Sequence, residues 1–203
     1  MIGAPENPVT EHAKIDLDIQ EMEAEMKKSP PDWAAAKAIY DDGKNSKKSD
    51  TVNRKISGFT LKSLEPFGKL YTDYNTATLP KGYSPHALVT DALVGANSNI
   101  TGAWGTGSIA NKKDFRSQVV KKVIKFQIVM LYALHEMEAA LVKYNDPAKT
   151  AEEAIHALDE WWVFYAGSLE DGKASGYSTY ILAEKRGTFF GTDSYDAGNG
   201  ACI

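Results

Sequence analysis

The sequence contains one cysteine, Cys202, and no long apolar run. One thiol cannot form an internal disulfide, and metal centres built from several thiolates are excluded as well. A membrane-spanning helix needs about 20 consecutive apolar residues. The longest apolar stretch, residues 128–134, is far too short, so we expect no membrane span.

Clustered positive charge is also missing, because the net charge is −4 and the lysine pairs are scattered along the chain. Binding to the phosphates of a nucleic acid requires Lys and Arg side chains to be grouped. We therefore expect no nucleic-acid partner, and we interpret the pairs as solvated helix faces and loops. They are Lys27-Lys28, Lys47-Lys48, Lys112-Lys113 and Lys121-Lys122.

The remaining composition is that of a folded protein. Hydrophobic residues make up 43% of the 203 positions, which is enough to build a core, and this length suits one domain. We expect a flexible lead at residues 1–9, a single helical domain at 10–191 and a flexible tail at 192–203.

Apolar residues recur at helical spacing over most of the chain. The clearest pattern predicts a long helix from about residue 111 to residue 144. The next helix is expected to begin at Asp146 and Pro147, with Asp146 as its cap, and to end near residue 166. Further helices are predicted from residue 10 to Pro30 and at 33–42, 85–94 and 177–186, whereas 51–64 is either a weak helix or irregular.

Strand patterns are short, because no alternation of apolar and polar residues extends beyond four or five positions. Amphipathic helices joined by short turns must bury their apolar faces against one another. The sequence thus predicts an all-α protein, a helical bundle of about five to seven helices with long loops.

Two histidines interrupt apolar helix faces together with acidic residues. His135 and Glu138 continue an apolar line of the long helix, and His156 and Asp159 repeat the same spacing on the next helix. The intervening turn places both pairs at similar height. A partly buried imidazole and carboxylate can share a metal ion, or each other's proton as a purely structural pair. These four residues are candidate metal ligands, and their chemistry suits iron.

Glu153 and His156 form a Glu-x-x-His motif, which is typical of di-iron carboxylate bundles. Such bundles need a second copy of the motif, but the long helix has Tyr132 where the second glutamate would stand. Glu153 joins the candidate metal ligands, and a di-iron site stays an incomplete alternative. His12 and His86 lie at helix starts and are expected to be surface residues.

Aromatic residues are dense between residues 161 and 165. Trp161 and Trp162 are candidates for binding a protein partner, with core packing as the alternative. No catalytic signature is complete, since the glycine-rich segment 102–107 lacks the Lys-Ser/Thr ending of a phosphate loop and no Ser-His-Asp set is evident. We therefore expect a protein that is not an enzyme.

Three short motifs resemble a known family. They are residues 32–40 followed by Asp-Asp-Gly-Lys-Asn-Ser, residues 159–170 and residues 183–191. In this order they resemble the algal iron-assimilating proteins, which are low-iron-inducible (also high-CO2-inducible) and periplasmic. The resemblance implies a secreted, periplasmic or cell-surface protein that assists iron acquisition by binding. Members of that family carry more cysteine than this chain, and residues 1–8 lack the features of a secretory signal.

Three functions remain open at this point. The first is a non-enzymatic iron-binding or iron-acquisition accessory protein. The second is a helical interaction module that docks a protein partner at the cell surface without metal, and the third is a di-iron oxidase. Metal content separates the first from the second, and oxygen consumption with ferrous iron separates the third from both.

Overall fold

The computed structural model of the chain describes residues 9–49, 51–60, 84–96, 109–172 and 175–191. Within these ranges nearly all regular structure is helical, so the predicted all-α class is confirmed. The predicted tail and all but residue 9 of the predicted lead lie outside these ranges. None of the described helices is long and apolar enough to cross a membrane.

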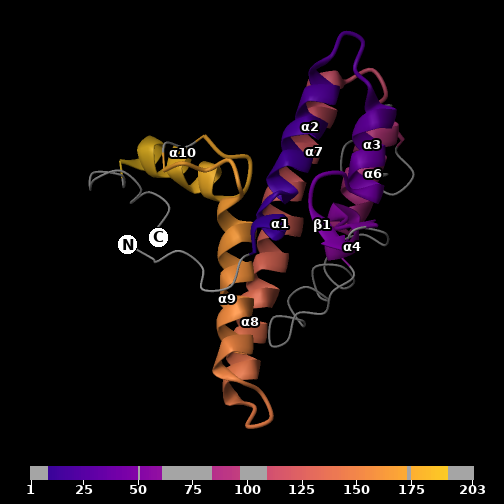
Figure 1. Cartoon of the computed structure of the whole chain (residues 1–203). Coiled ribbons are helices and arrows are strands. Elements are labelled where there is room, and N and C mark those ends of the chain that lie inside the picture. Colours follow the sequence, from indigo (N-terminus) through magenta and orange to yellow (C-terminus); the bar gives the residue numbers. More distant parts are fainter. Residues whose placement is uncertain (1–8, 50, 61–83, 97–108, 173–174, 192–203) are drawn as a thin grey trace.

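One continuous helical pillar runs the length of the molecule (Figure 1). It consists of α7 (Lys113–Val123), the π-helical segment η1 (Ile124–Val129) and α8 (Met130–Asn145). The predicted long helix is therefore present, with a wider turn in its middle. Helix α2 (Ile15–Lys27) packs along the first half of the pillar, and α9 (Ala151–Ala166) packs along the second half.

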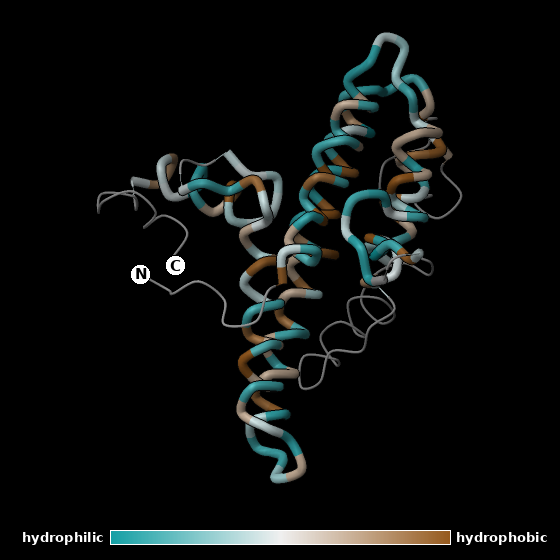
Figure 2. Tube along the Cα trace, in the orientation of Figure 1, coloured by the Kyte–Doolittle hydropathy of each residue, from teal (hydrophilic) through white to brown (hydrophobic). Residues whose placement is uncertain are grey.

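Helices α3 (Trp33–Asp42) and α6 (Pro85–Val94) complete a bundle with α2 and α7. Apolar and polar residues both recur along α2 and α3, as expected of helices that bury one face (Figure 2). Helix α10 (Tyr180–Phe190) lies to the side of the upper end of α9. Smaller elements lie around the junction between the bundle and the α8–α9 hairpin: α1 (Thr10–Ala13), the antiparallel strands β1 (Lys47–Ser49) and β2 (Val52–Asn53), and α4 (Ile56–Phe59).

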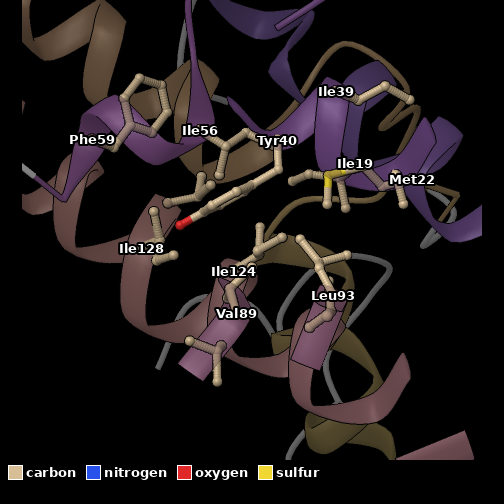
Figure 3. Packing of buried hydrophobic residues seen from close by; sticks show 14 of the residues in the cluster. Ile19, Met22, Ile39, Tyr40, Ile56, Phe59, Val89, Leu93, Ile124 and Ile128 are labelled. Atoms are coloured by element: carbon tan, nitrogen blue, oxygen red, sulfur yellow. The ribbon is translucent and has the colours of Figure 1, made fainter. Parts of the chain in front are cut away.

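Tyr40 is fully buried in the middle of the main core (Figure 3). Its hydroxyl forms a hydrogen bond with Nδ1 of His86 over 3.0 Å. A buried hydroxyl without a partner would cost about 1–3 kcal/mol, so His86, which is exposed as predicted, also completes the core. The surrounding apolar side chains come from α2, α3, α4, α6 and η1: Ile19, Met22, Ile39, Ile56, Phe59, Val89, Leu93, Ile124 and Ile128.

A buried carboxylate in the first turn of α2 ties this helix to the end of α9. Asp16 accepts hydrogen bonds from Ser168 Oγ over 2.7 Å and from the backbone N–H of Leu169 over 2.8 Å. Gly167 makes this approach possible, because a Cβ atom there would lie 2.4 Å from Asp16 Oδ2 and its φ is +88°. The two helices that flank the pillar are thus joined end to end.

A second buried carboxylate of α2 holds the loop that follows α3. Asp18 accepts hydrogen bonds from the backbone N–H of Asn45 and from its Nδ2, each over 2.8 Å, and from the backbone N–H of Lys44 over 3.2 Å. Burial raises the pKa of Asp18, while these donors lower it. The loop is therefore fixed to α2, and it leads directly into β1 and β2.

The start of α9 differs from the prediction. Helix α9 begins at Ala151 and is capped by Thr150, which forms a capping box with Glu153. The capping box satisfies two unpaired backbone donors reciprocally, so it defines the helix start better than Asp146 does. Asp146 Oδ1 instead accepts a hydrogen bond from the backbone N–H of Ala148 over 2.9 Å, which makes a local turn.

The last helix also differs from the prediction, because it continues through Gly187 to Phe190. Gly187 is buried inside the helix, where a missing side chain costs only about 1 kcal/mol relative to alanine. Gly191, with a φ of +68°, ends the helix in the left-handed conformation.

We expect Gly167→Ala to lower the free energy of unfolding by about 3 kcal/mol, since the new methyl group meets Asp16 and the backbone is strained. Gly172 is the matched control: its φ is +83°, but a Cβ atom there meets nothing within 4 Å. Gly172→Ala should therefore cost only about 1 kcal/mol. Urea unfolding of both variants tests the difference, and equal costs would show that the Asp16 contact does not constrain this turn.

Candidate functional site

Polar side chains converge where α1 and the segment after β2 meet the α8–α9 hairpin. They supply two imidazoles, two carboxylates, a phenol and a guanidinium. We call His12, Glu136, His156 and Glu160 the imidazole–carboxylate cluster. The complete set is His12 from α1, Arg54 after β2, Tyr132 and Glu136 from α8, and His156 and Glu160 from α9.

One oxygen of Glu160 is shared by two imidazoles. Its Oε1 lies 2.8 Å from His12 Nε2 and 3.2 Å from His156 Nε2. The His12 and Glu160 side chains are 16% and 17% exposed, whereas His156 is 38% exposed and forms the side of the cluster that faces solvent. A ligand can therefore reach the cluster past His156.

The two nitrogens of His12 have unequal surroundings. Nε2 contacts both Glu160 and the guanidinium of Arg54, and it cannot donate to the first and accept from the second at the same time. Nδ1 is buried and has no hydrogen-bond partner within the described part of the chain. His12 thus has one nitrogen with two competing partners and one nitrogen without a partner among the described residues.

The two carboxyl groups of the cluster share a hydrogen bond, and their pKa values are shifted in opposite directions. Burial, together with the negative charge of Glu160, raises the pKa of Glu136 to about 7. Burial acts to raise the pKa of Glu160, but the hydrogen bonds from His12 and Glu136, together with the charges of His12 and His156, outweigh it and lower the pKa to about 2. Near neutral pH the shared proton therefore belongs to Glu136, and Glu160 is the anion that faces the imidazoles.

Tyr132 lies one helical turn before Glu136 on α8. Burial, followed by the charge of Glu136, raises the pKa of Tyr132 well above its usual range. The side chain is therefore a phenol that forms a hydrogen bond with Glu136.

Local sequence explains how the cluster is assembled. Tyr132 and Glu136, like His156 and Glu160, are four residues apart and so lie on one face of their helix. The break between α1 and α2 at Lys14 turns α1 onto α9, with which it packs through a small apolar cluster. This cluster consists of Val9, Ala13 and Val163, with Trp162 against it, and it holds His12 beside α9.

Three further candidate ligands lie next to members of this cluster in sequence: His135 and Glu138 on α8, and Asp159 on α9. His135 stacks at a tilt on Tyr132, with ring centroids 5.7 Å apart. Glu138 is buried on α8, and Asp159 is partly buried on α9. As the side chains stand, no three His, Cys, Asp or Glu residues among those described are arranged to hold a metal ion. A ligand role for His135, Glu138 and Asp159 stays a prediction.

Glu153 is engaged at the start of α9, away from the partner that His156 uses. It accepts hydrogen bonds from the backbone N–H of Thr150 over 2.9 Å and from Lys149 Nζ over 2.9 Å. The Glu-x-x-His motif is thus divided between a helix cap and the imidazole–carboxylate cluster.

Trp161 and Trp162 are partly buried on adjoining faces of α9, with ring centroids 6.0 Å apart. Trp161 packs against the main core and Trp162 packs against the small apolar cluster of α1. Trp162 also meets Tyr180 of α10 edge to face, with centroids 6.4 Å apart. Both rings thus have packing roles, and a role in binding a protein partner stays a prediction.

Sequence reasoning missed three members of the cluster: His12, Glu136 and Glu160, the last of which lies one helical turn after His156. His12 was expected at the surface, but it is only partly exposed and lies against α9. Glu136 was not considered, although its spacing of four from Tyr132 was a usable signal. Nothing in the sequence indicated that α1, some 150 residues earlier, would meet α9.

The raised pKa of Glu136 makes stability depend on pH. Between about pH 4.5 and 7 the folded chain keeps a proton that an unfolded glutamate has lost, so the free energy of unfolding falls as pH rises through this window. Glu136→Gln cannot ionise, so this fall should shrink by roughly 1–3 kcal/mol. Urea unfolding from pH 5 to 8 measures it, with Glu152→Gln, an exposed position on α9, as control. An unchanged pH profile in Glu136→Gln would place the shared proton elsewhere.

Comparison with known proteins identifies a family. The family described as low iron-inducible periplasmic protein matches residues 4–195. No curated protein and no solved structure matches the chain. The match covers nearly the whole sequence and includes every residue of the imidazole–carboxylate cluster. The chain therefore belongs to the low iron-inducible periplasmic protein family.

Proposed function

We propose that the protein binds iron through the imidazole–carboxylate cluster. The observation that carries this proposal is the position of Glu160, whose Oε1 lies within 3.2 Å of an imidazole nitrogen from each of two helices and whose carboxylate also contacts Glu136. Imidazole and carboxylate side chains are ligands that iron accepts in either oxidation state. The family description supports a role under low iron.

The residues present fit iron on two further grounds. The Nε2 atoms of His12 and His156 both lie at the Glu160 carboxylate, and His156 is open to solvent. Glu136 holds its proton only up to about pH 7, so at higher pH the cluster carries two carboxylate charges. As they stand, the donors contact one another, and iron binding requires Glu160 to turn away from at least one imidazole.

The proposed role is that of an accessory protein in iron acquisition, which acts by binding. The family is described as periplasmic, and we infer a secreted, periplasmic or cell-surface location for this chain. A protein that binds iron with carboxylates and imidazoles also holds it reversibly, because protonation of these ligands competes with the metal.

We expect wild-type protein to bind one equivalent of iron, and His12→Ala and Glu160→Gln to bind it at least about tenfold more weakly. Calorimetric titration with ferrous chloride under argon and with ferric acetohydroxamate in air measures both oxidation states. Glu153→Gln is the matched control, since glutamine preserves a capping box, and His86→Gln controls for the loss of a histidine. Circular dichroism confirms that each variant is folded.

The other outcomes of this titration are informative as well. Loss of binding in Glu153→Gln alone would move the site to the Glu-x-x-His motif. No binding by wild-type protein would overturn the proposal and favour the interaction module. Rapid oxygen consumption on addition of ferrous iron would instead support a di-iron oxidase.

Iron affinity should also rise with pH between 6 and 8, because binding requires Glu136 to release its proton. The same titration in buffers of different ionisation enthalpy counts the released protons. Glu136→Gln should release fewer protons than wild type, and an equal number would show that Glu136 is not a ligand.

A further inference from the structure

A cavity of about 450 Å³ lies between α2, the α7–η1 part of the pillar, and α10 with the segment before it. We call it the basic cavity, and it shares no residue with the imidazole–carboxylate cluster. Among the described residues that line it, six are cationic and one is acidic. The cations are Lys27, Lys121, Lys122, Lys125, Lys185 and Arg186, and the acid is Glu23.

This concentration of positive charge was not visible in the sequence. The pair Lys121-Lys122 was expected to be a solvated helix face, and the net charge of the chain is −4. Folding brings the pair together with Lys27 from α2 and with Lys185 and Arg186 from α10. Because like charges repel, grouping these cations in one cavity lowers the stability of the folded protein.

Glu23 neutralises only the lysines at the buried base of the basic cavity. It is buried, with Oε1 at 2.9 Å from Lys125 Nζ and Oε2 at 3.1 Å from Lys121 Nζ, while Lys27 Nζ lies farther away at 3.9 Å. Both of its oxygens are thus occupied by lysines of the pillar. Glu23 forms no ion pair with Lys122, Lys185 or Arg186, which lie at the rim of the cavity.

The rim cations are Lys122, Lys185 and Arg186, and none of them forms an ion pair with a described carboxylate. Burial lowers the pKa of Lys122, and the charges of Arg186, Lys121 and Lys185 lower it further. These cations therefore repel one another across the opening. An anion placed between them would relieve this repulsion.

The walls of the basic cavity are held together by direct contacts. The π-helical turn of η1 is attached to the opposite wall, which is the segment before α10. Thr179 Oγ1 donates a buried hydrogen bond of 2.9 Å to the backbone oxygen of Lys125. The Lys125 ammonium lies 5.3 Å from the centre of the Tyr177 ring, in a cation–π contact. π-helical turns are frequent at functional sites, and this one sets a buried lysine at the base of a hollow.

We propose that the basic cavity binds a small polyanion that presents several carboxylate or phosphate oxygens. Its volume falls in the range of small-molecule sites, roughly 300–1,000 Å³. Arg and Lys together suit such oxygens, because guanidinium binds them in pairs and ammonium as a point charge. A concave site favours a small ligand over an extended acidic surface.

Calorimetric titration with citrate and with pyrophosphate, in about 150 mM salt, tests this proposal. Wild-type protein should bind one equivalent of at least one probe. The double variant Lys122→Ala/Arg186→Ala should bind it at least about tenfold more weakly, because two rim charges are lost. Lys48→Ala/Lys55→Ala is the matched control, since it removes the same charge from exposed positions outside the cavity.

The outcomes separate the sources of the ligand. Binding of citrate alone identifies a polycarboxylate, and binding of pyrophosphate alone identifies a phosphate compound. Binding of neither probe, or equal binding by the cavity variant, overturns the proposal. Binding to phosphatidylserine vesicles that the cavity variant loses, without binding of either probe, would overturn it in favour of a membrane surface.

This inference does not depend on the iron proposal. The rim residues lie outside the main core, so the double variant is expected to fold, and thermal unfolding checks this. His12→Ala should keep full polyanion binding, and Lys122→Ala/Arg186→Ala should keep full binding of ferrous chloride. The failure of either site thus leaves the result for the other unaffected.

Discussion

The position of α2 depends on two carboxylates that have been taken out of water, Asp16 and Asp18. Burying an ionised carboxylate is expensive unless hydrogen bonds replace its water, and each of these is satisfied by a different loop. Asp16 joins α2 to the end of α9, and Asp18 joins it to the loop before β1. Because α1 precedes α2 directly and Arg54 follows β2, these anchors also determine which side chains reach Glu160.

The imidazole–carboxylate cluster also contains carboxylates that are mostly buried, but here the hydrogen-bond donors present do not allow both carboxylates to ionise easily. Glu136 and Glu160 cannot both ionise cheaply at close range, so one proton stays between them near neutral pH. The two imidazoles and the guanidinium then surround the one remaining negative charge, that of Glu160. A divalent or trivalent cation would replace that proton and satisfy both carboxylates, and the proposed iron site rests on this property.

The sequence predicted the helices well and the site only partly, for a physical reason. Helical periodicity is a local signal, and the structure confirms the helices at 33–42 and 85–94, whose first turns are capped by the side chains of Asp32 and Ser84. His156 was found because its neighbours lie on the same helix. His12 was missed because its role arises from the docking of α1 on α9, a contact between distant segments that periodicity cannot encode. The basic cavity escaped for the same reason, since its cations come from three separate helices.

Iron K-edge X-ray absorption of protein loaded with one equivalent of iron tests the central claim most directly. Coordination by the imidazole–carboxylate cluster predicts a first shell of nitrogen and oxygen, with the outer-shell scattering of imidazole rings that weakens in His12→Ala. An all-oxygen shell without imidazole scattering, or a spectrum that His12→Ala and Glu160→Gln leave unchanged, would contradict it.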